Sequence, residues 1–357
     1  MSEPKPTAAH LEATDIDVSR GLASWLAQHR VSLAFSCYQS GQLFLVGLLP
    51  DGLISVNEQS FTRAMGLHWQ PGRLYLAGLD QVWRLENMLR LGELANGGFD
   101  QLLVPRNAQT TGDLDIHELA VTADGSVVFV NTKFSCLATL DLQHSFKPLW
   151  KPPFISRLAP EDRCHLNGLA MQDGKPRYVT AVSRSDIVTG WRARRDQGGV
   201  LLECPDGRVV TDLLSMPHSP RIDHNGSVLL LDSGRGQIVR IDPASGTSAD
   251  IAFCPGFLRG LSLHDNHAIV TVSKPRGGTF AGLSLEAELA SRDAAPWCGV
   301  LIVNLATGDV VEWIRIEGAI TELFDVVAMP GVRCPMAIGP GTLEMQSTIS
   351  FEDLQAY

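Results

Sequence analysis

The chain has 357 residues, of which 45% are hydrophobic and 19% charged, and its 33 glycines and 20 prolines are spread along its length. This composition is typical of many short strands joined by tight turns around a large core. The formal net charge is −10 and no basic cluster interleaves with aromatic residues, which excludes the usual pattern of a nucleic-acid binder, so no nucleic-acid partner is expected.

The first thirty residues are predicted to form a separate N-terminal segment. They contain acidic positions and no apolar run after a basic start, so no secretory signal is expected. Residues 11–30 show helical spacing with Leu22, Trp25 and Leu26 on one face, which predicts a helix on the rim of the main domain. No run of eighteen apolar residues occurs, so we expect no membrane partner and a cytoplasmic location.

A repeated unit occupies most of the remaining chain. Each copy has a short apolar strand, a turn of the D-G or P-G kind, and a second strand rich in Val, Leu, Ile and Tyr. The copies begin at Arg63, Ile116, Leu166, Pro217, Leu258 and, in a weaker form, Thr321. Their spacing of roughly forty to sixty residues is the size of a four-stranded blade. The sequence therefore predicts an all-β protein, a six-bladed β-propeller over residues 31–357.

The two ends of the chain are predicted to complete one blade together. Too little sequence follows the sixth copy to finish a blade, while residues 33–60 supply strands that lack an inner strand of their own. We expect the C-terminal strand to be the inner strand of a blade that the N-terminal strands complete, which removes two exposed edges. A seven-bladed ring with two partial blades is the alternative. Residues 280–297 form an insertion that either covers a pocket or decorates the periphery.

One position of the repeat is predicted to line an axial pocket. The start of each innermost strand in a propeller points toward the axis at one face, so equivalent positions from different blades converge there. Five of the six residues at this position are polar, whereas a purely structural repeat would favour small or apolar residues, because buried polar groups need partners. The six are Met65, His117, Asn167, His218, Arg259 and Glu322.

A second ring of polar residues is expected around the first. The strand that follows each inner strand returns to the same face and ends there in Asn131, Ser183, Asp232, Ser273 and Lys274. Glu118, His165 and Asp325 flank the inner ring directly. The predicted pocket therefore combines imidazoles with carboxylates and amide oxygens.

This combination predicts a divalent metal site. The candidate ligands are His117, His218, Asn167 and Glu322, with Asp232 as a further oxygen donor. Imidazole with carboxylate suits zinc, iron, manganese or copper better than calcium, which prefers oxygen ligands. Such a set leaves an open position for water or substrate, as catalytic metals require. The alternative is that the histidines bond to backbone carbonyls or to water in the channel.

The neighbouring charged residues suggest catalytic and binding roles. Glu322 or Asp325 is expected to accept a proton, and Arg259 to hold a substrate carboxylate in a bidentate fork. Alternatively, Arg259 pairs with one of these carboxylates as a buried ion pair. The residues predicted to contact the substrate are His165, Arg259, Asp232 and Lys274.

The cysteines and common catalytic motifs narrow the function further. The seven cysteines are widely spaced without a C-x-x-C pair, so most are expected to be buried apolar thiols. No nucleophile elbow, P-loop or dinucleotide-binding glycine motif occurs, which removes support for hydrolase-fold, phosphate-cradle and dinucleotide functions.

Two segments resemble a known superfamily. "LNGLAMQDG" from Leu166 and "GQIVRIDPASG" from Gly236 resemble segments of the calcium-dependent propellers that include gluconolactonases, senescence-marker proteins and strictosidine-synthase-like proteins. The resemblance implies a six-bladed propeller with a metal-binding asparagine at Asn167. Where those lactonases have an aspartate ligand in a P-D-G motif, this chain has His218, and their early E-G-P motif is absent. The chain is also similar to an uncharacterised group of bacterial propeller proteins, which implies no activity.

Together these patterns support one leading hypothesis and one rival. The leading hypothesis is a metal-dependent enzyme, hydrolytic or oxidative, that acts on a small polar or carboxylate-bearing molecule or a peptide side chain at the axial pocket. The rival is a non-catalytic propeller that binds a peptide or protein partner on its face, because a propeller fold does not fix a function.

Overall fold

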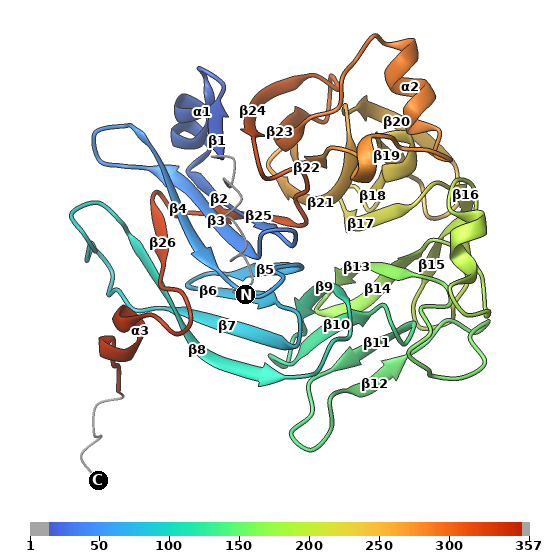
Figure 1. Ribbon diagram of the computed structural model, residues 1–357, viewed down its shortest axis with the longest axis horizontal. Coiled ribbons are helices and arrows are strands. Elements are labelled where there is room, and N and C mark those ends of the chain that lie inside the picture. The colour runs from blue at the N-terminus through green and yellow to red at the C-terminus, as the bar shows by residue number, and fades with distance from the viewer. Residues whose placement is uncertain (1–13, 352–357) are drawn as a thin grey trace, which may run out of the picture.

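The structure, a computed structural model, describes residues 14–351. Six separate sheets stand around a central axis like the blades of a propeller (Figure 1). The prediction of an all-β, six-bladed β-propeller is therefore confirmed. The part of the predicted N-terminal segment before residue 14 and the last residues, 352–357, lie outside the described residues.

Blade 1 is built from both ends of the chain. Its strands, from axis to rim, are β25 (Val326–Pro330), β2 (Val31–Cys37), β3 (Gln42–Leu48) and β4 (Ile54–Ser60). Strand β2 pairs antiparallel with β25, from Val31 opposite Pro330 to Phe35 opposite Val326. The predicted closure of one blade by N- and C-terminal strands is confirmed.

The other five blades each use four consecutive strands, ordered from axis to rim. Blade 2 comprises β5 (Leu67–Gln70), β6 (Arg73–Ala77), β7 (Gln81–Asn87) and β8 (Gln101–Thr110). Blade 3 comprises β9 (Ile116–Val121), β10 (Val127–Asn131), β11 (Cys136–Thr139) and β12 (Lys147–Trp150). Blade 4 comprises β13 (Leu166–Gln172), β14 (Lys175–Ala181), β15 (Gly199–Glu203) and β16 (Val209–Leu214).

Blades 5 and 6 complete the ring. Blade 5 comprises β17 (Pro217–Ile222), β18 (Val228–Asp232), β19 (Gln237–Ile241) and β20 (Ser248–Phe253). Blade 6 comprises β21 (Phe257–His264), β22 (His267–Ser273), β23 (Cys298–Asn304) and β24 (Val310–Glu317). Burial explains their sequences: every residue of β18 is buried between neighbouring blades, whereas the first three residues of the outer strand β20 are exposed. The second strand, β18, therefore reads as a nearly continuous apolar run, and the outer strand β20 as a mixed one.

Two short strands extend the outer edges. Strand β1 (Asp15–Val18) pairs antiparallel with β24, and β26 (Pro335–Ala337) pairs parallel with β8. The sixth repeat copy therefore differs from the others, because its second half does not fold back on β25. Added edge strands of this kind shorten the exposed backbone of a sheet.

The described part of the chain has three α-helices on the outside of the ring: α1 (Leu22–His29), α2 (Leu285–Ser291) and α3 (Leu343–Ser347). Helix α1 buries Leu22, Trp25 and Leu26, and this face packs into a core cluster shared by blades 1 and 6. Its C-cap is Arg30, which adopts a left-handed backbone conformation. None of the helices within residues 14–351 combines the length and apolar character that crossing a membrane requires.

Small and larger residues alternate around the middle of the ring. The inner-strand positions, in blade order from blade 2 round to blade 1, are Gly66, Glu118, Gly168, Ser219, Gly260 and Asp325. A Cβ on Gly260 would lie 2.6 Å from Asp325 Cα, and one on Gly66 would lie 2.9 Å from the carbonyl oxygen of His117. Each glycine thus lets the next blade approach, as the narrow centre of the ring demands.

Candidate functional site

Three imidazole rings gather at one end of the axis. His117 lies at the start of β9 and His218 at the start of β17, while His165 directly precedes β13. The ring centroids of His117 and His165 are 4.9 Å apart, and those of His117 and His218 are 6.4 Å apart. His165 also stacks on Trp191, with centroids 4.2 Å apart. The repeat position that predicted His117 and His218 thus brings them together, and His165 joins them.

The Nδ1 atoms of His117 and His218 face the protein backbone. His117 Nδ1 lies 2.9 Å from the carbonyl oxygen of Asp115 and 2.9 Å from the Thr132 hydroxyl. That hydroxyl donates its own proton to the Leu166 carbonyl oxygen, so Nδ1 of His117 is the donor in both contacts. His218 Nδ1 donates to the carbonyl oxygen of Met216 at 2.7 Å. In these tautomers Nε2 of each ring carries the free lone pair.

Burial keeps these two rings neutral. Loss of solvation lowers the pKa of His117, and it lowers the pKa of His218 well below its usual range. Nε2 of both rings is therefore a basic or metal-ligating atom at neutral pH, and not a cationic anion receptor.

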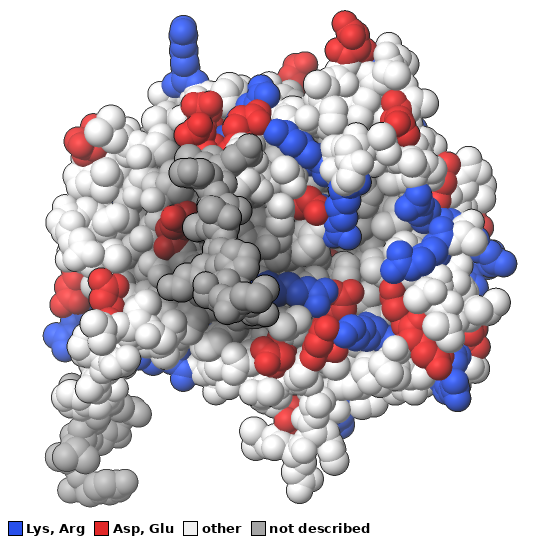
Figure 2. All heavy atoms as spheres, in the orientation of Figure 1, with Lys and Arg blue, Asp and Glu red and all other residues white. Residues whose placement is uncertain are grey.

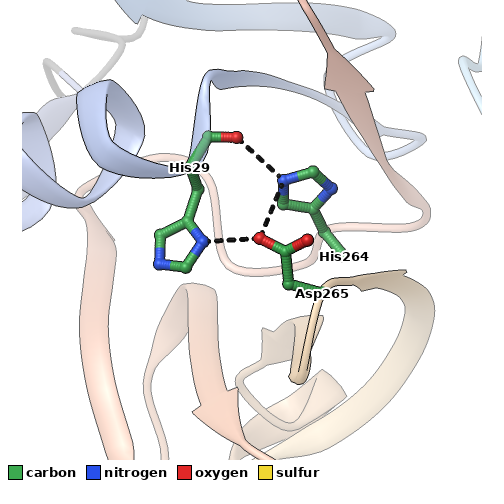
Figure 3. A group of neighbouring side chains, drawn as sticks. All are labelled: His29, His264 and Asp265. Atoms are coloured by element: carbon green, nitrogen blue, oxygen red, sulfur yellow. Dashed lines mark hydrogen bonds and ion pairs between the residues drawn. The ribbon is translucent and has the colours of Figure 1, made fainter.

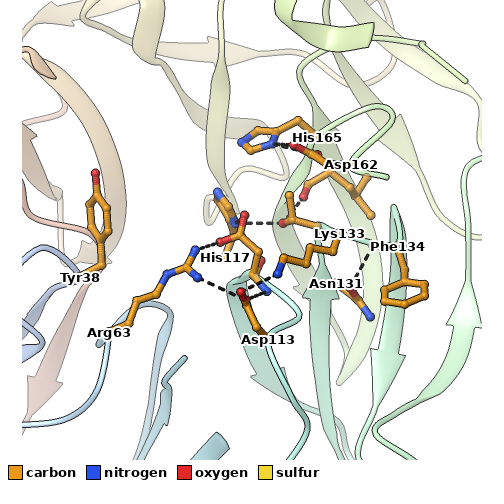
Figure 4. Close-up of polar contacts among 12 residues, drawn as sticks. Tyr38, Arg63, Asp113, His117, Asn131, Lys133, Phe134, Asp162 and His165 are labelled. Carbon is orange, nitrogen blue, oxygen red and sulfur yellow. Dashed lines mark hydrogen bonds and ion pairs between the residues drawn. The ribbon is translucent and has the colours of Figure 1, made fainter. Parts of the chain in front are cut away.

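His165 is oriented by a carboxylate in place of a carbonyl. Its Nδ1 lies 3.0 Å from Asp162 Oδ2 (Figure 4). The same carboxylate accepts the indole N–H of Trp191 at 2.7 Å. The Nδ1 atoms of all three imidazoles are therefore held by fixed acceptors of the protein.

A recurring backbone conformation shapes this mouth of the channel. The residue two positions before the axial residue has a positive φ in four successive blades: Arg63 (54°), Asp115 (54°), His165 (50°) and Met216 (49°). Residues other than glycine adopt this conformation rarely, and such strain concentrates at functional sites. At Asp115 and Met216 it accompanies a carbonyl that faces the imidazole two residues later. The sequence pattern did not predict that these four equivalent residues share a backbone conformation.

Arg259 forms an ion pair within the site. Its Nη2 lies 3.0 Å from Glu322 Oε2, and its guanidinium lies over the Phe257 ring at 4.8 Å from the centroid. Glu322 also accepts from Arg276, at 2.7 Å, and from the Tyr38 hydroxyl. Arg259 therefore makes the buried ion pair with Glu322 that was one of the two predictions for it. Tyr38, Phe257 and Arg276 are site residues that the repeat pattern did not predict.

Glu322 is not at the repeat position that the sequence suggested. It lies in the loop before β25, and the inner-strand residue equivalent to His117 is Phe324. The packing between blades fixes this register. Asp325 packs against Gly260 of the preceding blade in the same way that Glu118 packs against Gly66. Phe324 precedes Asp325 as His117 precedes Glu118, so Phe324 and His117 are equivalent. The correction replaces one polar residue of the inner ring by an aromatic one, whose centroid lies 5.3 Å from that of His117.

A second charged cluster borders the imidazoles. Arg63 and Lys133 both contact the carboxylate of Asp113, at 3.2 Å and 2.5 Å, and Arg63 also pairs with Asp115 (Figure 4). Both basic and acidic side chains border the part of the central hollow that is visible in Figure 2. The mouth of the channel is therefore polar and charged, with both signs present.

Several predicted residues have other contacts. Asn167 Oδ1 accepts from Thr180 at 2.7 Å, while its buried Nδ2 has no partner among the described residues. Asp232 accepts the backbone N–H of Ser215, and burial raises its pKa to about 6. Lys274 pairs with Glu317 at 2.7 Å. Asp232 and Lys274 therefore contact neighbouring structural residues and not the three imidazoles.

Asp325 faces the neighbouring blade. Its carboxylate accepts the backbone N–H of Leu67 at 2.8 Å, as Glu118 accepts that of Leu169 at 2.7 Å. Glu118 also pairs with Arg221, and both residues line a cavity of about 280 Å³. Burial raises the pKa of Glu118 to about 7 and that of Asp325 to about 6. These carboxylates form a layer distinct from the imidazoles.

The insertion at residues 280–297 borders the site. Its Phe280, with Leu285 and Leu289 of α2, packs in one cluster with Phe257. Phe257 in turn contacts the His218 ring, with centroids 5.6 Å apart. The insertion thus supports the aromatic wall beside His218.

Ligand atoms are closest together elsewhere in the molecule. Within residues 14–351, His29, His264 and Asp265 form the one group of three histidine, cysteine or acidic residues whose ligand atoms all lie within 4.8 Å of one another. The axial imidazoles are more widely spaced, and Glu322 is engaged by Arg259 and Arg276. A metal at the axis would therefore require the rings to close on it.

Comparisons with known proteins agree with the fold. A family model described as "Domain of unknown function (DUF4915)" matches residues 20–338. A chain in the crystal structure of a nidogen/laminin complex is similar, with a TM-score of 0.53, 10% identity, and coverage of 84% of this chain and 99% of that chain. A protein of unknown function from Bacteroides caccae has a TM-score of 0.51 and 11% identity, with the same coverage.

These likenesses show the fold alone, because the identities are low. No curated protein matches the chain. The resemblance to the gluconolactonase superfamily is not confirmed by the family match or by these two structures.

Proposed function

The chain belongs to the family described as a domain of unknown function (DUF4915), and on that premise we propose that it is a metal-dependent enzyme whose site is the axial mouth. The proposed ligands are the Nε2 atoms of His117, His165 and His218. The proposed substrate is a small carboxylate-bearing molecule, held beside the ion by the arginines next to Glu322.

The orientation of the imidazoles carries this proposal. A histidine that binds a metal through one nitrogen nearly always donates from the other to a carbonyl or carboxylate, which fixes its tautomer and raises its basicity. His117 and His218 each donate to a backbone carbonyl, and His165 Nδ1 contacts the Asp162 carboxylate. Three histidines that leave a further position open form the ligand set of catalytic zinc.

The ring spacing is close to what one ion needs. With a metal–nitrogen distance of about 2.0–2.1 Å, two imidazoles on a tetrahedral ion have centroids about 5 Å apart. His117 and His165 stand at 4.9 Å, while His117 and His218 stand at 6.4 Å. An approach of His218 by roughly 1 Å or more would complete the site.

The charges beside the imidazoles favour an anionic substrate. Arg259 and Arg276 share the single carboxylate of Glu322, so this cluster carries one excess positive charge. Arg276 keeps 66% of its side chain exposed, so its guanidinium is accessible to a substrate carboxylate. Glu322, which accepts a hydrogen bond from the Tyr38 hydroxyl, is the proposed proton acceptor. A bound ion would supply a Lewis acid and an activated water.

Metal analysis tests the proposal directly. Protein without a histidine tag is purified as the His264→Ala variant, so that metal at His29, His264 and Asp265 does not contribute. We expect about one equivalent of transition metal, and His117→Ala or His218→Ala in the same background should lower it by at least tenfold. His144→Ala, at an exposed turn, is the matched control. Zinc would favour hydrolysis, and iron or copper oxidation.

The opposite result would favour the rival function. Metal-free protein that also takes up no added zinc, or metal retained by both axial variants, would overturn the proposal and leave a propeller that binds a peptide or protein partner.

The anion receptor has a separate test. Malonate binding to the metal-loaded protein, measured by calorimetry, should weaken about tenfold in Arg276→Gln, the loss of roughly one charged hydrogen bond. Arg157→Gln removes another exposed arginine that pairs with one glutamate, Glu161, and should leave binding unchanged.

A further inference from the structure

Three histidines and an aspartate meet on the outside of the ring, far along the chain from one another. His29 is the last residue of α1, His264 is the last residue of β21, and Asp265 follows it in the tight turn to β22, which begins at His267. Figure 3 shows His29, His264 and Asp265. His29 Nδ1 lies 2.7 Å from Asp265 Oδ2, and His264 Nε2 lies 3.7 Å from the same oxygen. Two segments more than two hundred residues apart thus present imidazole and carboxylate to one point.

We propose that His29, His264 and Asp265 form a second divalent-metal site, of the zinc class, which joins helix α1 to the β21–β22 turn. Imidazole with carboxylate is a ligand set that zinc and its neighbours in the transition series accept. The site lies outside the axial mouth, and its ligands are none of the residues proposed to act there.

The spacing of the donor atoms fits a tetrahedral ion. Ligand atoms at about 2.0–2.2 Å from such an ion lie roughly 3.3–3.5 Å apart. The 2.7 Å and 3.7 Å separations of Asp265 Oδ2 from the two imidazole nitrogens bracket that value. In the metal-bound form both rings bind as neutral imidazoles, each with its proton on the nitrogen that faces away from the ion.

Its surroundings favour a cation. His264 Nε2 now contacts the carbonyl oxygen of His29 at 3.1 Å, at the C-terminal end of α1, where the helix dipole attracts positive charge. The ring of His267 lies 4.9 Å from that of His29, and its Nδ1 is buried without a partner among the described residues. A buried polar atom without a partner is uncommon and needs an explanation. A nearby ion with bound water would give it one.

The ion would stabilise the docking of α1. The helix presents Leu22 and Leu26 to the core shared by blades 1 and 6, and Trp25 packs against the rings of His29 and His267. A metal bound to both segments ties the end of this helix to blade 6. Because the ion binds only when α1 is docked on blade 6, its binding would stabilise the folded protein and raise the melting temperature.

Zinc titration of the metal-stripped full chain tests the inference. The axial variant His117→Ala/His218→Ala is used, so that the outcome does not depend on the proposed axial metal. We expect one zinc per chain by calorimetry and a rise in melting temperature of roughly 3–4 °C at free zinc a hundredfold above the dissociation constant. Cobalt in place of zinc should give the visible absorption of a tetrahedral site.

Variants decide whether these residues hold the ion. His264→Ala should weaken zinc binding by about 10- to 100-fold and, at the same free zinc, reduce the rise in melting temperature to roughly 0.5–2 °C. Asp265→Asn changes a side chain that is 58% exposed, so it should fold normally and still lose affinity. His144→Ala is the control and should bind like its parent. Failure of the axial variant to bind zinc, or unchanged binding in both His264→Ala and Asp265→Asn, would overturn the inference.

Discussion

Replacement of Glu118 by glutamine should remove a pH-dependent loss of stability. Glu118 is 3% exposed, and its Oε2 accepts the backbone N–H of Leu169 at 2.7 Å. Burial raises its pKa to about 7, and the charge of Asp325 acts in the same direction, while Arg221 opposes both. The pKa of Glu118 therefore depends on whether its burial outweighs its ion pair with Arg221.

The magnitude follows from the difference between the folded and unfolded pKa values. An increase from 4.5 to about 7 corresponds to roughly 3 kcal/mol at about 1.36 kcal/mol per unit. The folded state holds the proton more tightly, so the favourable contribution is complete below pH 4.5 and is lost as the pH rises through 7. The wild-type protein should lose this amount over that window, whereas Glu118→Gln has no carboxyl group to titrate.

Urea unfolding followed by tryptophan fluorescence measures the effect. The free energy of unfolding of Glu118→Gln minus that of the wild type should increase by roughly 3 kcal/mol between pH 4.5 and pH 7.5. Glu93→Gln, at an exposed turn, should show a constant difference. A difference that is flat or that decreases with pH would refute the reasoning, because it would mean that Arg221 keeps the buried carboxylate ionised.

Three further predictions concern packing. Leu26→Ala, on the buried face of α1, should lower the free energy of unfolding by about 2–5 kcal/mol in urea, and a loss below about 1 kcal/mol would mean that the helix does not stabilise the ring. Gly260→Ala should lower it by about 1–3 kcal/mol, because the new Cβ would meet the backbone of Asp325; unchanged stability would contradict that contact. All seven cysteines are buried, so Ellman's reagent should react only after denaturation, and a thiol that reacts in the native protein would be inconsistent with the core.

The repeat pattern was enough to predict the ring and most of its axial residues. Within a hairpin, the turn and the alternation of side chains fix which residue starts the inner strand, and both features are local in sequence. The repeat therefore predicted His117, His218 and Arg259 at the mouth of the channel. The need to pair exposed strand edges likewise predicted that β25 joins β2.

The sixth copy is the one whose register the local sequence pattern does not specify. Strand β25 has no hairpin partner after it, because β26 pairs with β8 of another blade. Its register is set by contact of Asp325 with Gly260 in the neighbouring blade, and such a contact leaves no turn signal in the sequence. Phe324, and not Glu322, therefore occupies the ring position.

The sequence alone determined the propeller, its closure and the column of residues that begins the inner strands, because period-two patterning and turn chemistry act over short stretches of chain. Only the tertiary structure decided what those residues contact. Arg259 meets Arg276 through Glu322, and His29 meets Asp265 across 236 residues, because packing between blades joins parts of the chain that share no local pattern.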